Sequence, residues 1–452
     1  MRQIKNFKAL EKVPAASPAF ADRFDMFTPL ANSVAAGSLP EDKPFELSNP
    51  NFRQITLNAN DLGPQNGGVK LGDNWDMNTL NETGPNAGSF LFTPYETGAA
   101  GVRRLNVATG EAETIVAEGT QGFVAGDASL WTPFGTYLTA EESWGAGSTK
   151  GRLFELTNPL ADAGSTDFVA RTILPRVSHE GLAFDADNNL YFIDEFNSGS
   201  IYKYVSSTPT DGSTFFDEGE TFVLKVGTGG NNDALGAATW VKIANSDGSA
   251  VNAAANVTID GQTYVDGRLA ADLAGGSAYN RPEDLVIKTV DGQQKLYFAA
   301  TASSTDGAGA VYAIGLTDAA NANVTLFANR DTLKIGTGAA VGLEFKNPDN
   351  LAIDSFGNIY IVEDQPGGAA DIWFAYDNNF DGVAEAVGRW ASLSTEGAEP
   401  TGLYFDPFRP NVAYVNVQHA NSDVDRTIII ESVPELVTLG IPAGTHWDNL
   451  GG

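Results

Sequence analysis

Cysteine is absent from this chain of 452 residues, and histidine occurs only three times. The absence of cysteine excludes a disulfide, a thiolate metal site and a cysteine nucleophile. The scarcity of histidine excludes a histidine-rich metal centre. Any metal site must therefore be built from oxygen ligands, which favours Ca²⁺ or Mg²⁺ over zinc. No apolar run approaches the roughly 18 residues of a transmembrane helix, so no membrane span is expected.

Basic residues are scarce. Lys and Arg number 27 against 57 Asp and Glu, and the formal net charge is −30. Binding to nucleic acid phosphates requires a basic face, so nucleic acid is not an expected partner. An acidic surface commonly serves solubility in saline surroundings. The alternative is that some of these acids bind hard cations, and only their positions in the chain separate the two readings.

The N-terminal region carries few strand signals. Met1 to Phe20 contains basic residues but lacks the apolar core of a secretory signal, so we expect that an export signal is absent from this chain or was removed ahead of its first residue. Residues 1–50 are expected to form an N-terminal arm. No linker rich in Pro and Gly divides the remainder, so residues 51–452 are expected to form one domain.

Short runs of β-branched and aromatic residues, separated by Gly, Asn, Asp and Pro, dominate the chain from Phe52 onwards. The clearest are Ser89–Thr93, Glu113–Ala117, Gly135–Thr139, Asn189–Ile193, Lys295–Ala299 and Asn358–Val362. Amphipathic helix patterns are rare. The pattern indicates an all-β fold, with a sandwich, a barrel or a propeller as the options.

A repeated hairpin decides among these options. The segment Gly181–Asp194 aligns with Asn350–Glu363, and each has two apolar strands around an Asp/Asn/Gly turn. Glu283–Ala300 and Thr401–Asn416 follow the pattern more loosely. Repeated units of this kind predict a β-propeller, and the length suggests six blades. The insertion from Thr208 to Ala271 interrupts the period.

Polar tips precede the first strand of each unit. They read Ser178-His179-Glu180, Asn280-Arg281-Pro282-Glu283, Asn347-Pro348-Asp349 and Glu399-Pro400-Thr401. In a propeller the first strand of each blade lines the central channel, so we expect these tips to converge at one mouth. Arginine matches phosphate oxygens with a planar fork, and carboxylate-bound cations polarise a phosphoryl group. The alternative is that Arg281 pairs with Glu283 and only fastens a blade.

These tips, taken together and in order, resemble the PhoX-type alkaline phosphatases. Further matching segments are Phe92–Glu96, Gly101–Leu105, Pro133–Glu142 and Val415–His419. The resemblance covers roughly residues 85–420. It implies a propeller phosphomonoesterase with an iron pair and calcium ions at the mouth, usually exported to the periplasm or the extracellular space.

The resemblance also implies roles for individual residues. Arg281 is the expected phosphate clamp and substrate-binding residue, and Arg281 and Glu283 are the expected catalytic residues. The metal ligands that it implies are Glu96, Glu141, Glu142, Glu180, Glu283, Asp349 and Asp364. His179 has two functional readings, as an iron ligand or a general acid, and a structural one, as a packed turn residue. His419 closes a strand run, and a structural role is favoured for it.

One position departs from the family pattern. The family has an iron-ligating cysteine where this chain has Ala140, and an alanine methyl group binds no metal. Calcium is therefore the expected cofactor, and iron is left open. Two alternatives to a phosphatase follow, namely a non-catalytic calcium-binding propeller and a calcium-dependent lactonase or phosphotriesterase-like hydrolase.

A separate signal lies at Asp377-Asn378-Asn379-Phe380-Asp381-Gly382. Asp377, Asn379 and Asp381 have the spacing of a calcium loop, with oxygens at alternate positions and Gly at the sharp turn. Position twelve is Gly388 rather than Glu, so the loop is not a complete EF-hand. It is either a structural calcium site or an acidic hairpin turn.

The expected partner of the whole chain is a small phosphoester, and we expect a monomer.

Overall fold

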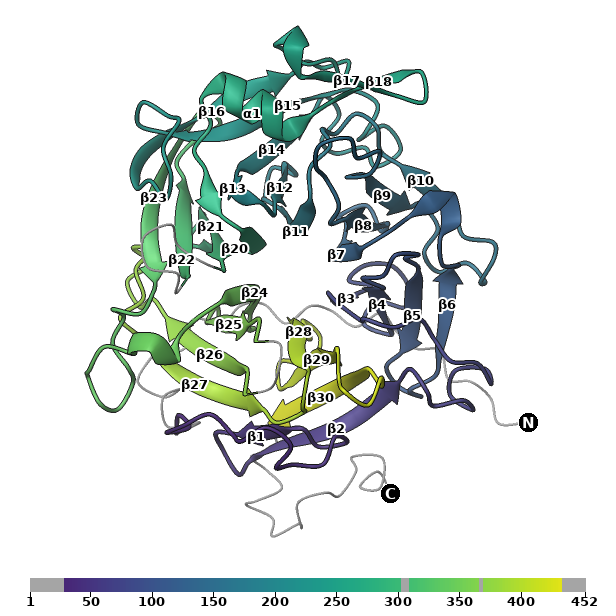
Figure 1. Cartoon of the computed structure of the whole chain (residues 1–452), viewed down its shortest axis with the longest axis vertical. Coiled ribbons are helices and arrows are strands. Elements are labelled where there is room, and N and C mark those ends of the chain that lie inside the picture. Colours follow the sequence, from purple (N-terminus) through teal and green to yellow (C-terminus); the bar gives the residue numbers. More distant parts are fainter. Residues whose placement is uncertain (1–27, 302–308, 366–368, 433–452) are drawn as a thin grey trace.

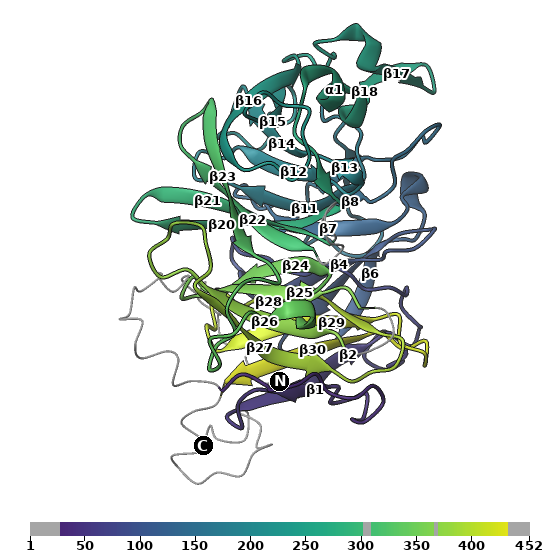
Figure 2. The same cartoon turned by 60° about the vertical axis from the view of Figure 1, so that its left-hand side comes forward.

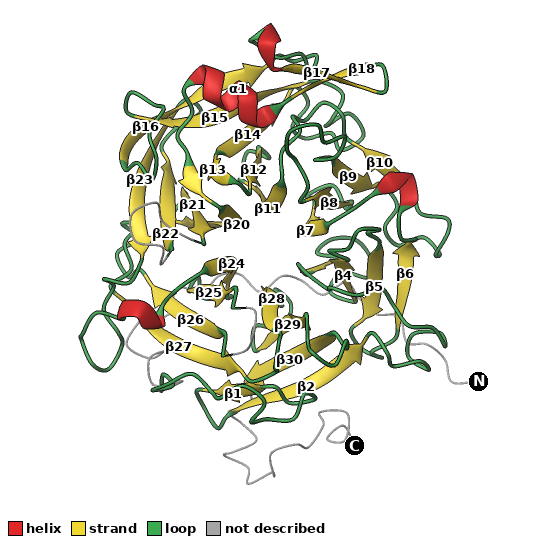
Figure 3. Cartoon of the chain, viewed as in Figure 1, coloured by secondary structure: helices red, strands yellow, loops and turns green. Residues whose placement is uncertain are grey.

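The structure is a computed structural model that describes residues 28–301, 309–365 and 369–432. Antiparallel sheets surround a central axis in these residues (Figure 1). Strands dominate the regular structure, and helices are few and short (Figure 3). The predicted all-β propeller is therefore confirmed. Each of the strand runs named above coincides with a strand to within about two residues.

Two four-stranded sheets come first in the chain. Each is an antiparallel meander whose first strand lies nearest the axis and whose last lies at the periphery (Figure 1). The first contains β3 (Thr79–Leu80), β4 (Phe90–Pro94), β5 (Val102–Asn106) and β6 (Ala112–Val116). The second contains β7 (Gly126–Trp131), β8 (Tyr137–Glu141), β9 (Leu153–Leu156) and β10 (Phe168–Ala170).

A nine-stranded sheet follows, in which two meanders join at their outer edges. The first has β11 (His179–Phe184), β12 (Leu190–Asp194), β14 (Ile201–Ser206), β15 (Gly219–Val226) and β16 (Gly236–Ala244). The second has β20 (Pro282–Val290), β21 (Gln293–Ala300), β22 (Ala310–Leu316) and β23 (Asn321–Ala328). Pairing of β16 with β23 connects the two. The number of six blades stays a prediction, because strand pairing divides the described residues into five sheets of four or more strands.

The last two sheets each take a strand from the N-terminal part of the chain. One contains β24 (Pro348–Ile353), β25 (Ile359–Glu363), β26 (Asp371–Tyr376) and β27 (Ala386–Leu393), with β1 (Phe45–Leu47) at its outer edge. The other contains β28 (Glu399–Phe405), β29 (Val412–Gln418) and β30 (Arg426–Ser432), with β2 (Phe52–Ala59) outermost. Because β2 pairs with β30, the two ends of the propeller chain close the ring.

The predicted arm over residues 1–50 falls partly outside the described residues, since description begins at residue 28. Within the arm, Ser33 donates a hydrogen bond to Asp371, and β1 pairs with β27. The boundary at residue 50 stays a prediction. The absence of an export signal in Met1 to Phe20 also lies outside the described residues.

The repeated hairpin owes its shape to an aspartate at the turn. Asp185 Oδ1 accepts hydrogen bonds from the backbone N–H groups of Asp187 and Asn189, at 2.9 and 2.8 Å. Asp354 accepts the equivalent pair from Phe356 and Asn358. Asp favours such turns because its carboxylate satisfies backbone groups that the turn leaves unpaired. The sequence repeat thus marks the ends of the inner hairpins that lie away from the predicted mouth.

The segment from Thr208 to Ala271, predicted as an insertion, contains β15 and β16 and so belongs partly to the nine-stranded sheet. Its additional elements are β17 (Asn256–Ile259), β18 (Gln262–Val265) and the start of α1 (Gly267–Ala274), which lie beside β15 and β16 at the periphery of the ring (Figure 2). The small strands β13 (Asn197–Gly199) and β19 (Tyr279–Asn280) pair nearer the axis. No helix within the described residues is long and apolar enough to span a bilayer.

Candidate metal and phosphate site

A cavity of about 150 Å³ lies where the inner strands begin. Ten carboxylates line it, together with Arg281, Gln418 and His419. The carboxylates are those of Asp76, Glu96, Asp127, Glu142, Glu180, Glu195, Glu283, Asp349, Asp364 and Glu399. They come from every sheet around the axis, so the predicted convergence of the tips is present in the structure. We call this cavity the acidic pocket.

β-bulges aim many of these acids at the axis. The pairing register shifts at the start of β7, β11, β20 and β24. A bulge leaves two residues opposite one, so it redirects a side chain that regular alternation would turn elsewhere. The acid is the second residue of the strand in all four cases, namely Asp127, Glu180, Glu283 and Asp349.

Burial makes these carboxylates costly to ionise. Glu180 and Glu283 are 4% and 2% exposed. Burial raises the pKa of both groups well above the usual range, and the charges of neighbouring carboxylates raise them further. The pKa of Asp349 rises for the same two reasons. Glu399 is less enclosed, and burial together with Asp364 raises its pKa to about 8. The protein alone therefore does not balance the negative charge of the acidic pocket.

Arg281 is the one Arg or Lys side chain that lines the acidic pocket. Its Nε donates to Glu195 Oε1 at 2.7 Å, and its Nη2 lies 3.4 Å from Glu283 Oε1. Burial alone would lower the pKa of Arg281, but the charges of Glu283 and Glu195 raise it. The side chain is 42% exposed. The guanidinium is therefore charged, fixed in orientation and accessible to an anion that enters the mouth.

His179 and His419, for which the sequence left the role open, occupy different environments. His419 lies at the rim, with Nε2 3.3 Å from Glu399 Oε1, and the hydrogen bond with Glu96 is the main cause of its raised pKa. His179 is fully buried against Phe192 and does not line the acidic pocket. Burial lowers the pKa of His179 to about 3, so its ring is uncharged. The structure thus places His419 at the site and His179 in the packed core.

The donor set fits hard cations. One carboxylate oxygen each from Asp127, Glu142 and Glu180 lies within 4.8 Å of the others, and the same holds for Glu180, Glu195 and Glu283. Asp127 Oδ1 is buried and has no hydrogen-bond partner in the structure. Glu283 Oε1 is buried as well and has no hydrogen bond, only the ion pair with Arg281 at 3.4 Å. Buried polar atoms normally have a partner. Clustered oxygens without one are what Ca²⁺ or a similar cation would bind.

Most of the predicted site residues line the acidic pocket. These are Arg281 and the six carboxylates of Glu96, Glu142, Glu180, Glu283, Asp349 and Asp364. Glu141 lies elsewhere, because its carboxylate accepts hydrogen bonds from the backbone and the guanidinium of Arg152. Ala140 packs in an apolar cluster with Leu138 and Val177. Of the two adjacent acids Glu141 and Glu142, only the second therefore faces the site.

The predicted calcium loop forms the turn between β26 and β27. The two carboxylate oxygens of Asp377 accept backbone N–H groups of Asp381 and Gly382, at 3.0 and 2.8 Å. Asn379 Oδ1 accepts from Asp381 N as well. These oxygens satisfy the turn itself. The structural calcium site at Asp377, Asn379 and Asp381 stays a prediction.

Four pocket carboxylates were missing from the predicted set, namely Asp76, Asp127, Glu195 and Glu399. Three have a signal in the sequence. Asp127 precedes an apolar strand as Glu283 does, Glu195 matches Asp364 in the repeat, and Glu399 opens one of the tips. Asp76 precedes β3, which has only two residues. No strand pattern could have revealed it.

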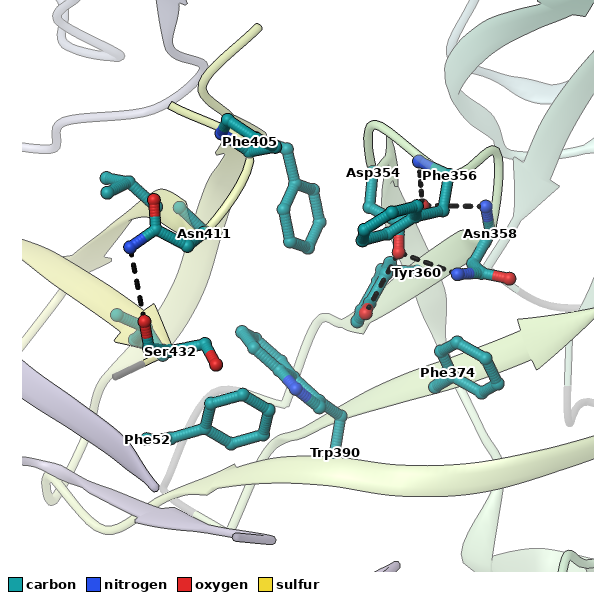
Figure 4. A pocket seen from close by; sticks show the side chains of 14 residues that line it. Phe52, Asp354, Phe356, Asn358, Tyr360, Phe374, Trp390, Phe405, Asn411 and Ser432 are labelled. Carbon is teal, nitrogen blue, oxygen red and sulfur yellow. Dashed lines mark hydrogen bonds between the residues drawn. The ribbon is translucent and has the colours of Figure 1, made fainter. Parts of the chain in front are cut away.

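A second cavity, of about 210 Å³, lies away from the mouth, at the opposite end of β24 from Asp349. Figure 4 shows its aromatic lining, including Phe52, Trp390 and Phe405. Its Asp354 carboxylate accepts the hydrogen bonds of the hairpin turn. This cavity lacks the converging charges of the acidic pocket, which is therefore the candidate site for an ionic ligand.

Comparison with known proteins identifies the family. The alkaline phosphatase PhoX family matches residues 83–421. A solved structure of PhoX from Pseudomonas fluorescens, in complex with the transition-state analogue vanadate, has a similar fold, with a TM-score of 0.65 and 17% identity. The match covers 90% of this chain and 98% of that chain.

Similarities to other solved structures are more distant. A nutrient-binding protein from Bacteroides ovatus has a TM-score of 0.46 at 10% identity, over 88% of this chain and 76% of that chain. No curated protein matches significantly. The family match spans about three quarters of the chain and includes twelve of the thirteen residues that line the acidic pocket, all but Asp76. The chain therefore belongs to the alkaline phosphatase PhoX family.

Proposed function

We propose that this protein hydrolyses phosphomonoesters and releases inorganic phosphate, with cations bound in the acidic pocket. The observation that carries the proposal is the convergence of ten carboxylates and one arginine in a cavity of about 150 Å³. Carboxylates alone repel a phosphate dianion. A pocket of this composition accepts one only when bound cations reverse its charge.

The residues proposed to hold cations are Glu96, Glu142, Glu180, Glu283, Asp349 and Asp364, together with Asp127 and Glu195. Glu180 belongs to both groups of converging oxygens, so its carboxylate would contribute to cation binding in both. Bound Ca²⁺ would polarise the phosphoryl oxygens and stabilise the charge that develops on them. The oxygen donors favour calcium, and elemental analysis decides whether iron is also present.

Arg281 is proposed to bind the phosphate and, with Glu283, to be a catalytic residue. Its guanidinium is anchored by Glu195 and Glu283, so little entropy is lost when it meets an anion. A planar guanidinium can donate two parallel hydrogen bonds to phosphate oxygens. Gln418 and His419 surround Glu399 at the rim and hold its carboxylate in place.

Family membership supports the remaining proposals. The Pseudomonas relative binds vanadate, which agrees with a phosphoryl-transfer site in this chain. We propose a periplasmic or extracellular location and a role in phosphate acquisition. We also propose that the chain acts as a monomer.

The test combines elemental analysis with turnover of p-nitrophenyl phosphate, before and after chelation and after readdition of calcium. Calcium-dependent turnover that Glu283→Gln abolishes supports the proposal. Glu155→Gln is the matched control, because Glu155 is equally buried but pairs with Arg171. Full turnover by Glu283→Gln contradicts the proposed site.

Two other outcomes separate the alternatives. Calcium binding without turnover of any phosphoester indicates a binding protein. A preference for a lactone or a phosphotriester over the monoester indicates the other class of hydrolase.

A further inference from the structure

Hydrogen bonds connect neighbouring inner strands at the residues that directly follow two of the pocket carboxylates. Asp284 follows Glu283 and is 2% exposed. Its Oδ2 accepts a hydrogen bond from the backbone N–H of Leu351 in β24 at 2.9 Å, and its Oδ1 accepts one from the backbone N–H of the next residue, Leu285, at 2.7 Å. One carboxylate therefore connects β20 with β24.

Asn350 repeats this arrangement in the next sheet. It follows Asp349 and is 1% exposed. Its Oδ1 accepts the backbone N–H of Gly402 in β28 at 2.7 Å. The carbonyl of Gly402 in turn accepts a hydrogen bond from Nδ2 of Asn78, which lies just before β3, at 2.9 Å. The connection thus continues from β24 through β28 to the first sheet.

Gly181 occupies the corresponding position after Glu180. A Cβ atom built there would lie 2.4 Å from Asp284 Oδ1 and 2.4 Å from Leu285 N. Only glycine permits so close an approach. The strand β11 therefore packs directly on the carboxylate that connects β20 with β24.

The bulges explain why these connections exist. Leu285, Leu351 and Gly402 lie within or at the end of the register shifts that begin β20, β24 and β28. A bulge interrupts the ladder and leaves a backbone N–H without its usual partner. A buried N–H without a partner is unfavourable, so another acceptor is required. Asp284 and Asn350 supply it, and in doing so they tie each bulge to the strand before it.

We propose that Asp284 and Asn350 are positioning residues, which set the placement of Glu180, Glu283, Asp349 and Glu399 relative to one another for cation binding. The proposal rests on the proposed function only in that the acidic pocket holds cations. Consecutive Cα atoms lie about 3.8 Å apart. A connection one residue away therefore restrains the backbone that carries the carboxylate, and its loss is expected to weaken a cation site shared between strands.

The test compares Asp284→Ala and Asn350→Ala with Asp185→Ala. Asp185 is also a buried acceptor of two backbone N–H groups, but it acts within its own hairpin, away from the mouth. Calorimetric titration with calcium chloride measures affinity without any need for turnover. We expect at least a tenfold loss of calcium affinity in the two variants and wild-type affinity in the control.

Turnover supplies a second measurement. In Asp284→Ala and Asn350→Ala, the calcium concentration for half-maximal turnover rises, and excess calcium restores activity. A purely structural role would lower thermal stability in all three variants and leave the calcium dependence of each unchanged. That result overturns the proposal. Should an alanine variant not fold, Asp284→Asn, which keeps one acceptor oxygen, takes its place with an intermediate loss expected.

The two proposals fail in different ways. Calcium binding by the wild type without phosphoester turnover removes the proposed phosphatase activity but leaves the positioning proposal to be judged by the titration. Wild-type affinity in Asp284→Ala and Asn350→Ala removes the positioning proposal alone. A wild-type protein that binds no divalent cation overturns both.

Discussion

The acidic pocket should make the stability of the cation-free protein fall as pH rises. The pKa of Glu399 gives the size of this loss of stability, since it rises from 4.5 to about 8 on folding. A shift of one unit is worth about 1.4 kcal/mol, so this group alone corresponds to about 5 kcal/mol. Its contribution is present in full below pH 4.5, declines as pH rises, and is lost above about pH 8. The raised pKa values of Glu180, Glu283 and Asp349 act in the same direction.

Calorimetry of chelated protein between pH 5 and pH 9 measures this effect. Unfolding entropy is about 2.1 cal/mol/K per residue, so about 5 kcal/mol corresponds to a fall in Tm of about 6 °C for a domain of about 400 residues. His419 adds to the fall, because a raised histidine pKa stabilises the folded state at low pH and that stability is lost as pH rises. Saturating calcium should remove most of the slope, since bound cations replace the missing protons.

Two results would refute this reasoning. One is a Tm of the chelated protein that does not change between pH 5 and pH 9. The other is an equal pH slope with and without calcium, which would mean that the groups responsible lie outside the acidic pocket. Glu283→Gln supplies an internal check, because a neutral side chain in this position should raise the Tm of the chelated protein at pH 8.

Three further predictions concern single residues. Arg281→Lys should lower kcat/KM for p-nitrophenyl phosphate about a hundredfold, because a lysine cannot donate in parallel to two phosphate oxygens; unchanged kinetics would remove its role as clamp. Arg389→Met should cost about 3–5 kcal/mol in urea unfolding, because it leaves the buried Asp371 carboxylate without its cationic partner; a loss below 1 kcal/mol would contradict this. Gly181→Ala should cost about 1–3 kcal/mol by overpacking against Asp284, measured by Tm, and an unchanged Tm would show that β11 can move away.

The sequence predicted the fold because strand alternation and the turn residues repeat. The Asp185 and Asp354 turns look alike in the sequence because each must satisfy the same two backbone N–H groups. The number of sheets was harder to predict. β16 pairs with β23 because the outer edges of two meanders meet in space, and no local sequence pattern predicts such a contact.

The site was predicted where an acid precedes an apolar strand and missed where that context is weak. Glu180, Glu283 and Asp349 stand out before their strands, whereas Asp76 precedes only two strand residues. Glu141 and Glu142 show a second limit. Both are acids at the end of one strand, and only the position of Arg152 on the neighbouring strand edge determines which of them is paired away from the pocket.

Four of the carboxylates that line the acidic pocket lie where the regular pattern of the strands is broken. The regular alternation of side chains along a strand does not by itself account for the second residue of β7, β11, β20 and β24 facing the axis. A register shift accompanies this residue in all four strands. In β24 and β28 the shift also leaves a backbone N–H group to be satisfied, and Asp284 and Asn350 accept it from the preceding inner strand. The shift in β24 therefore both redirects the Asp349 carboxylate and fastens its strand to β20.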